Sequence, residues 1–280
     1  MLLKKKSYQN NLSITTKNGV FSNLTGEHRS IFSGNGLDFK ELREYTTGDD
    51  IRHVNWKVTA RSLEPSVNIF NEDKQLNIVL VYLNAGSIFF GTKRSKKDVM
   101  IETLASLHFA ALNKNDMVSS LFFSNKEEKF YTPSKQKGLI DENIKTALKL
   151  EPLNNIIDYA NLNEFLLLKI KKRSLIFLIG DFLELPDLKP LSVKHELYCV
   201  IVRDKMEEDL KLMGEFNFID TNTLSEQTIS LDEDGIKKYN QLIKKHDKAL
   251  FTQLKKLKIR YKKIYTNDNV QKKLLELLRS

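Results

Sequence analysis

The residues best suited to chemistry in this 280-residue chain are the charged side chains between positions 34 and 61, where acids and arginines alternate. Two of the acids, Asp49 and Asp50, are adjacent, and arginines stand on both sides of them. Because a planar guanidinium group matches a carboxylate through two parallel hydrogen bonds, the pattern favours a structural network of ion pairs. We expect five charged residues to form one connected, buried network: Arg43, Asp49, Asp50, Arg52 and Arg61.

The same two carboxylates fit a second hypothesis. Neighbouring acids can act as general acid and general base in a hydrolase when both open onto a cleft. Asp49 and Asp50 can do so only if arginines do not occupy their oxygens. The direction in which the two side chains point therefore separates a hydrolase from the structural network that we favour.

A turn and two short strands are expected to hold these charges in place. Gly48 begins a turn signal, because glycine accepts a positive φ and the acids that follow bond to nearby backbone N–H groups. Val54, Trp56 and Val58 then alternate with polar residues, which predicts a strand with Trp56, the single tryptophan, anchoring its apolar face. Residues 67–71 return as the partner strand of a β-hairpin.

The spacing of these residues also matches a known signature. The stretch reads G-x-G-L-x-F-x-x-L-R-x-Y-x-x-G-D-D-x-R-x-x-x-W-x-x-T-A-R and resembles the signature of the bacterial domain-of-unknown-function 58 family. The matching residues are Gly34, Gly36, Leu37, Phe39, Leu42, Arg43, Tyr45, Gly48, Asp49, Asp50, Arg52, Trp56, Thr59, Ala60 and Arg61. The resemblance, which extends over residues 26–280, implies a von Willebrand factor A-like domain after the signature and a MoxR-type AAA+ ATPase as partner.

From Asn77 onward, apolar strands alternate with amphipathic helices. The predicted strands are 78–83, 117–123, a short edge strand at 129–131, 174–179, 197–202, 216–219, 228–231 and an edge strand at 260–265. The predicted helices are 96–113, 139–150, 162–171, 235–258 and 269–278. This alternation is typical of a doubly wound, mostly parallel α/β sheet with helices on both faces, as the resemblance also implies.

Two domains follow from this reading. Residues 1–74 are expected to form an N-terminal β subdomain that carries the signature, beginning with a weakly patterned hairpin or lead-in over residues 1–27. Residues 75–280 are expected to form the α/β domain, ending in basic helices. The strands and helices of the C-terminal part continue without a linker, so we do not separate them from the α/β domain.

The resemblance also implies a position for a divalent metal ion at the top of the sheet. Such a hard cation needs oxygen ligands. The implied positions are Leu83, Ala85, Ser87, a site near Ile157 and Asp158, and Asp181. Because leucine and alanine cannot bind a metal, we expect a degenerate site without metal or other cofactor, in which Ser87, Asp158 and Asp181 are remnants. Ile88, Phe89 and Phe90 follow, which predicts an apolar rim.

Other catalytic patterns are absent from the sequence. The five histidines show no metal-ligand spacing, and neither a P-loop nor a Gly-x-Ser-x-Gly motif occurs. Cys199, the single cysteine, lies in an apolar run and is expected to be a buried, inert thiol. We therefore expect a protein-interaction module rather than an enzyme, acting as an adaptor of the ATPase.

The positive charge of the C-terminal region suggests an alternative function. Residues 235–280 hold 14 Lys and Arg against 3 Asp and Glu, a net charge of +11 in a chain of +9, so the remainder carries −2. The lysine-rich C-terminal helices could bind nucleic acid or another anionic surface, although a solvated helix face is the commoner cause of such a pattern. The apolar runs are too short to span a membrane, and the N-terminus lacks a signal-peptide pattern, so we expect a cytoplasmic protein.

Overall fold

The computed structural model describes residues 38–62, 64–71, 75–211, 213–219 and 226–279. The described part divides into two compact units, one within residues 32–75 and one within residues 76–280, and each is presented by itself. The expected hairpin or lead-in at residues 1–27 lies outside the described residues, as do Gly34, Gly36 and Leu37 of the signature.

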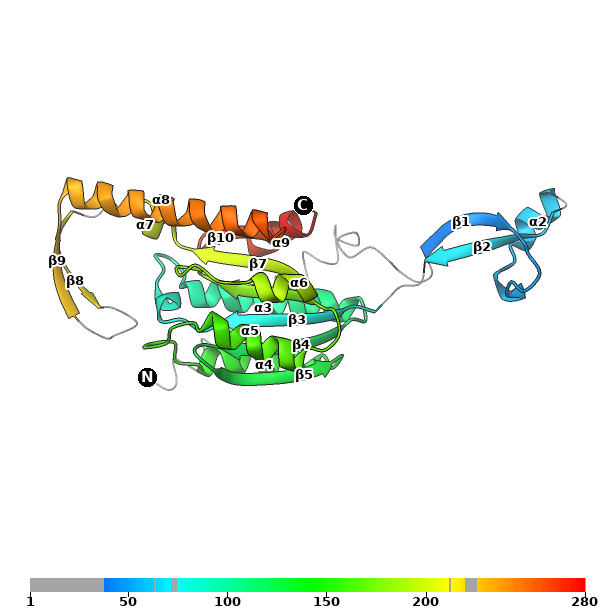
Figure 1. Cartoon of the computed structure of the whole chain (residues 1–280), viewed down its shortest axis with the longest axis horizontal. Coiled ribbons are helices and arrows are strands. Elements are labelled where there is room, and N and C mark those ends of the chain that lie inside the picture. Colours follow the sequence, from blue (N-terminus) through cyan, green and yellow to red (C-terminus); the bar gives the residue numbers. More distant parts are fainter. Residues whose placement is uncertain (1–37, 63, 72–74, 212, 220–225, 280) are drawn as a thin grey trace. The chain divides into compact units, whose positions relative to one another are not determined.

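The larger unit is built on a six-stranded sheet in the order β10-β7-β6-β3-β4-β5 (Figure 1). All neighbouring strands are parallel except β5, which runs antiparallel to β4 at one edge. The strands are β3 (Asn77–Leu83), β4 (Met117–Phe123), β5 (Glu127–Ser134), β6 (Leu175–Gly180), β7 (Glu196–Arg203) and β10 (Arg260–Tyr265). The continuous apolar runs of β3, β6 and β7 are buried because helices cover both faces of the sheet.

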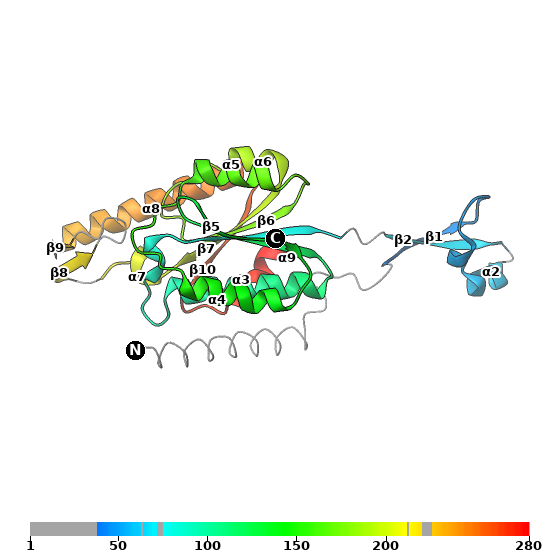
Figure 2. The ribbon, with the colours of Figure 1, turned by 90° about the horizontal axis from the view of Figure 1, so that it is seen from below.

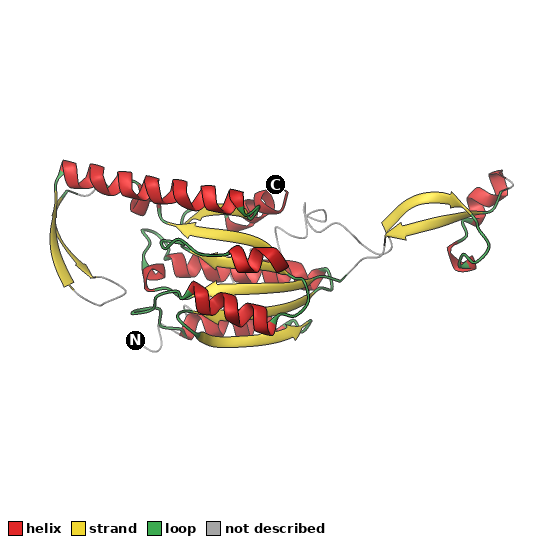
Figure 3. Ribbon diagram, in the orientation of Figure 1, coloured by secondary structure: helices red, strands yellow, loops and turns green. Residues whose placement is uncertain are grey.

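Helices cover both faces of the sheet, as Figure 2 shows, and Figure 3 distinguishes the helices from the strands by colour. One face carries α3 (Lys96–Asn113), α4 (Gly138–Lys149) and α9 (Val270–Arg279), and the other carries α5 (Tyr159–Lys169), α6 (Lys189–Lys194) and α8 (Glu233–Lys256). Successive residues of β3 divide between the two cores: Leu80 packs in the first and Val81 in the second. No helix in the described part of the chain is both long and apolar enough to cross a membrane.

The mixed α/β architecture and its mostly parallel central sheet confirm the coarse fold prediction. The predicted edge strands are β5 and β10, and Cys199 is a free, fully buried thiol in β7. The strand pieces predicted at 216–219 and 228–231 are β8 (Gly214–Ile219) and β9 (Glu226–Leu231), which pair with each other in a separate two-stranded sheet. A four-residue helix, α7 (Lys205–Glu208), precedes them.

The order of the strands creates a crevice between β3 and β6. From β3 the chain crosses through α3 to β4 on one side, whereas β6 lies on the other side of β3. The loops after β3 and β6 therefore diverge from adjacent strand ends. In open parallel sheets this switch in direction is where ligands bind, at the carboxyl ends of the strands.

The smaller unit differs from its prediction. β1 (Asp38–Glu44) pairs antiparallel with β2 (Ser66–Asn71), but the strand predicted around Trp56 is a helix, α2 (Trp56–Ser62), preceded by the 3-10 helix η1 (Ile51–His53). Asn55 explains the change, because its Oδ1 accepts a hydrogen bond from the backbone N–H of Val58 and so caps the helix. Trp56 is consequently 66% exposed and anchors no apolar face.

Candidate functional site

The crevice between β3 and β6 contains a hollow of about 220 Å³, called here the sheet-edge hollow. Residues from the loop after β3, the loop before α5, the first residue of α5 and the loop after β6 line it: Ala85, Ser87, Asn155, Ile156, Ile157, Tyr159, Asp181, Leu183 and Glu184. Four of the positions implied for a metal, Ala85, Ser87, Ile157 and Asp181, therefore meet at one place. The loop before α5 is joined directly to the first loop, since the Gly86 N–H donates to the Asn155 carbonyl oxygen at 3.0 Å.

Asp181 is the centre of the polar contacts beside the hollow. Its Oδ2 accepts a hydrogen bond from the Ser87 hydroxyl and lies 3.0 Å from the ammonium nitrogen of Lys96. The same ammonium lies 2.5 Å from Oε1 of Glu207, on α7. The Lys96 side chain is fully buried, so one lysine is held between two carboxylates that lie far apart in the sequence.

The local structure of the chain fixes the position of Lys96. It is the first residue of α3, directly after Ser95, whose side chain caps the helix in a reciprocal capping box with Asp98. The Lys96 N–H also donates to the carbonyl oxygen of Phe90 at 2.8 Å. Lysines 96 and 97 resemble the solvated start of an amphipathic helix, which is why sequence reasoning did not identify Lys96 as part of the site.

The electrostatics of the two carboxylates differ. Burial opposes ionisation of Asp181, but the charge of Lys96, the hydrogen bond from Ser87 and the charge of Arg203 outweigh it, so the pKa of Asp181 is lowered. Burial dominates at Glu207 and raises its pKa despite the contact with Lys96. Asp181 is thus an ionised acid whose neighbouring cation belongs to the protein itself.

Two of the other implied metal positions serve the fold. Leu83 lies in the core with 2% exposure and packs over Gly180, where an added Cβ would lie 2.9 Å from Leu83 Cδ1. Asp158 caps α5, accepting from the N–H groups of Ala160 and Asn161 at 3.0 Å each, and it is absent from the lining of the hollow. The prediction of Asp158 as a metal-site remnant is therefore corrected, because its oxygens face a helix N-terminus. The described residues contain no group of three or more His, Cys, Asp or Glu arranged to hold a metal ion.

A second set of buried charges, Arg203 and Asp247, lies next to the loop that carries Asp181. Arg203 is fully buried and donates to the carbonyl oxygen of Phe182 at 3.1 Å, while its Nη2 lies 3.4 Å from Asp247 on α8. Phe182 has a φ of +49°, which is uncommon for a bulky residue. Because Phe182 follows Asp181 directly, Arg203 helps to hold the loop that carries this acid.

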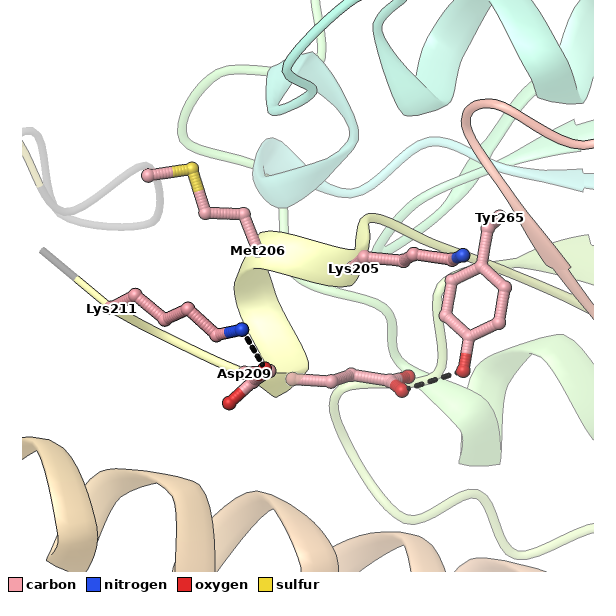
Figure 4. Close-up of a pocket in the computed structure, with 6 residues that line it drawn as sticks. Lys205, Met206, Asp209, Lys211 and Tyr265 are labelled. Carbon is pink, nitrogen blue, oxygen red and sulfur yellow. Dashed lines mark hydrogen bonds and ion pairs between the residues drawn. The ribbon is translucent and has the colours of Figure 1, made fainter.

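α7 connects the two sets of charges. Its Glu207 contacts Lys96, and its Glu208 lies 2.5 Å from the ammonium of Lys263, which also contacts Asp247 at 2.6 Å. Beside α7 lies an open pocket of about 740 Å³, where the Tyr265 hydroxyl donates to Glu208 at 2.8 Å (Figure 4). Its acids are already paired, Asp209 with Lys211 and Glu208 with Lys263, and it does not lie where the strand order reverses, so the sheet-edge hollow remains the better candidate site.

The signature forms two separate pairs rather than one network. Arg43 and Asp49 lie 2.8 Å apart, and Arg52 and Asp50 lie 2.7 Å apart. Arg61 is exposed and has no ion pair within the described part of the chain. The prediction of one connected five-residue network was therefore wrong, because Arg43 pairs with Asp49 and Arg52 with Asp50 in two separate pairs.

Two further features of the signature are the geometry of its turn and the surroundings of its two acids. Gly48 has a φ of +109°, as the turn requires, and the Tyr45 N–H donates to the Pro65 carbonyl oxygen at 2.8 Å. Hydrogen bonds from Arg52 lower the pKa of Asp50 to about 2. Both acids point into arginines, which leaves the hydrolase hypothesis without a general base at Asp49 or Asp50.

Comparison with known proteins matches the family profile described as "Protein of unknown function DUF58" to residues 41–249. The uncharacterized proteins Rv1480 of Mycobacterium tuberculosis and Mb1516 of Mycobacterium bovis are each 25% identical to the chain over 229 residues, covering 79% of it and 72% of their own length. Among solved structures, an aerotolerance-related membrane protein from Bacteroides fragilis aligns with a TM-score of 0.45 and 12% identity, over 73% of this chain and 98% of that one. BatB from Bacteroides thetaiotaomicron aligns with a TM-score of 0.44 and 10% identity, over 73% and 97%.

Proposed function

The chain belongs to the DUF58 family, and we propose that it is a non-catalytic protein-interaction module that serves as an adaptor of a MoxR-type AAA+ ATPase. In this proposal the larger unit is a von Willebrand factor A-like domain with a degenerate metal site. The sheet-edge hollow, with its surrounding loops, is the binding face. The observation that carries the proposal is the buried ammonium of Lys96, which is paired with Asp181 at the edge of the sheet where a ligand is expected.

Apolar side chains on the same three loops support a protein partner. Phe89 and Phe90, after β3, are 40% and 42% exposed, Ile156 is 47% exposed, and Leu185, after β6, is 49% exposed. Exposed aromatic and aliphatic groups on the loops that contribute to a hollow are typical of protein-binding surfaces. Ile88 is fully buried and does not belong to the rim, in contrast to its prediction.

Binding to the ATPase can be tested with purified proteins. The chain should be recovered with the MoxR-type ATPase of the same organism in at least one of the ATP-analogue and ADP states. Phe90→Ser should weaken the complex by about tenfold or more, since exposed aromatic anchors dominate such interfaces. Val193→Ser is the matched control, because Val193 is an exposed apolar residue, 83% accessible, on α6. Failure to recover the wild-type complex in either nucleotide state would contradict the proposal.

A second candidate function is binding of nucleic acid or another anionic surface through α8. Lys244, Lys248 and Lys255 line a shallow pocket of about 410 Å³ beside Phe251, and none of the three forms an ion pair with another described residue. Binding of this kind should appear as retention on heparin that weakens steeply with salt. Absence of retention at low salt would exclude this function.

A further inference from the structure

We propose that the sheet-edge hollow receives a basic side chain, lysine or arginine, of the partner protein. This inference rests on the proposed function and specifies the chemistry that the binding face recognises. It reverses the recognition expected of an intact metal site, in which a bound cation attracts an incoming carboxylate.

The shape and lining of the hollow suit a long side chain with a charged end. Its apolar lining comes from Ile156, Ile157 and Leu183 with a small contribution from the loop after β3, and its acids are Asp181 and Glu184. Lysine and arginine have an aliphatic stem that packs on apolar surface and a head that seeks carboxylates. The hollow thus offers complementary surface to both parts of one basic side chain.

The charge balance around the hollow is negative. Both contacts of Asp181, from Ser87 and from Lys96, use Oδ2, and the ammonium of Lys96 is shared with Glu207. Glu184 forms no ion pair with any residue that the structure describes. Its pKa is raised, first by partial burial and then by the charge of Asp181, so an incoming cation would favour its ionised form.

An incoming carboxylate has no comparable partner. Among the described residues, Lys96 is the only lysine in contact with Asp181, and its side chain is fully buried and already lies within 3.0 Å of two carboxylates. A partner carboxylate would meet Asp181 and Glu184 and be repelled by both. Charge complementarity therefore selects a basic side chain over an acidic one.

Hydrogen bonds connect the loops around the hollow to one another. The Asp158 N–H donates to the carbonyl oxygen of Ser124 at 3.1 Å, and the Asn155 carbonyl oxygen accepts from Gly86. Arg203 donates to the carbonyl oxygen of Phe182, in the loop after β6. A site whose walls are fixed beforehand loses less conformational entropy when it binds, which favours recognition of a single side chain.

The test is a titration of the full chain, followed by amide NMR shifts, with three acetylated and amidated tripeptides, Ala-X-Ala. X is lysine in the first, the uncharged norleucine in the second and glutamate in the third. The lysine peptide should shift the amides of Ser87, Ile157 and Glu184 saturably, and norleucine should bind about tenfold more weakly. Glu184→Gln should weaken the lysine peptide several-fold, whereas Glu127→Gln, which neutralises an exposed acid on the edge strand β5, should leave its affinity unchanged.

Four outcomes would overturn the inference. Equal binding of the norleucine peptide would show that the site is apolar. Preference for the glutamate peptide would show that the site binds carboxylates. In both cases the face still binds a peptide, so the proposed function would survive. Saturable shifts of the same amides by Mg²⁺, with displacement of the lysine peptide, would show a metal site. Absence of shifts with all three peptides would remove the hollow as a binding site, and the ATPase recovery experiment would then judge the proposed function separately.

Discussion

Lys96 Nζ lies 3.0 Å from Asp181 Oδ2, although the two residues are 85 positions apart in the sequence. The pair joins the start of α3 to the loop after β6, and Glu207 extends it to α7. A single buried ammonium therefore connects three elements at the carboxyl edge of the sheet. We expect removal of this ammonium to lower the free energy of unfolding of the larger unit.

Lys96→Met keeps an unbranched side chain, one heavy atom shorter and uncharged, and leaves Asp181 and Glu207 without their shared cation. We expect the free energy of unfolding to fall by about 3–5 kcal/mol, because an unpaired buried charge is costly. Urea denaturation measures this loss. Lys93→Met, in an exposed position, should be neutral, and adding Asp181→Asn to Lys96→Met should recover part of the stability. A Lys96→Met protein as stable as wild type would show that the pair contributes nothing to the fold.

Asp50→Ala, in contrast to Lys96→Met, should leave the stability of the protein unchanged. Asp50 pairs with an Arg52 side chain that is 87% exposed, and solvent screens such a pair. We expect a melting temperature indistinguishable from that of wild type, in contrast to the large loss predicted for a buried network. Thermal denaturation followed by circular dichroism is sufficient. A marked drop would indicate that the signature is covered in the folded protein.

His108 should make stability depend on pH. It is 1% exposed in α3, its Nδ1 lies 2.9 Å from Asn143 Nδ2, and burial lowers its pKa to about 4. Between pH 6.5 and 4, His108 is protonated in the unfolded chain but neutral in the folded chain. Protonation therefore favours the unfolded state, and the free energy of unfolding falls by up to about 3 kcal/mol as the pH drops from 6.5 to 4. Above pH 6.5 the contribution of His108 to stability is fully present. His108→Gln should flatten this part of the pH profile in urea denaturation. Identical profiles for both proteins would contradict the prediction.

The long elements after Asn77 could be predicted because their apolar residues repeat over many positions. α3 spans the predicted residues 96–113, and β10 spans the predicted residues 260–265. The alternation around Trp56 covers only five residues and fits the start of a helix as well as a strand, so the Asn55 cap decided the outcome. Lys96 could not be predicted as part of the site, because only the packing of α3 against the loop after β6 shows that it is buried.

Mg²⁺ or Mn²⁺ at millimolar concentration should leave the melting temperature unchanged, and EDTA should not affect partner binding. Mg²⁺ needs about six oxygen ligands, whereas Leu83 and Ala85 offer no side-chain oxygen and Oδ2 of Asp181 already accepts hydrogen bonds from Ser87 and Lys96. Specific binding to the folded state at 100 times the dissociation constant would stabilise it by about 2.7 kcal/mol, which a thermal shift assay detects readily. A saturable Mg²⁺ shift that disappears in Asp181→Ala would restore a metal-dependent mechanism. A shift that persists in Asp181→Ala would place the ion elsewhere, and the prediction for this site would stand.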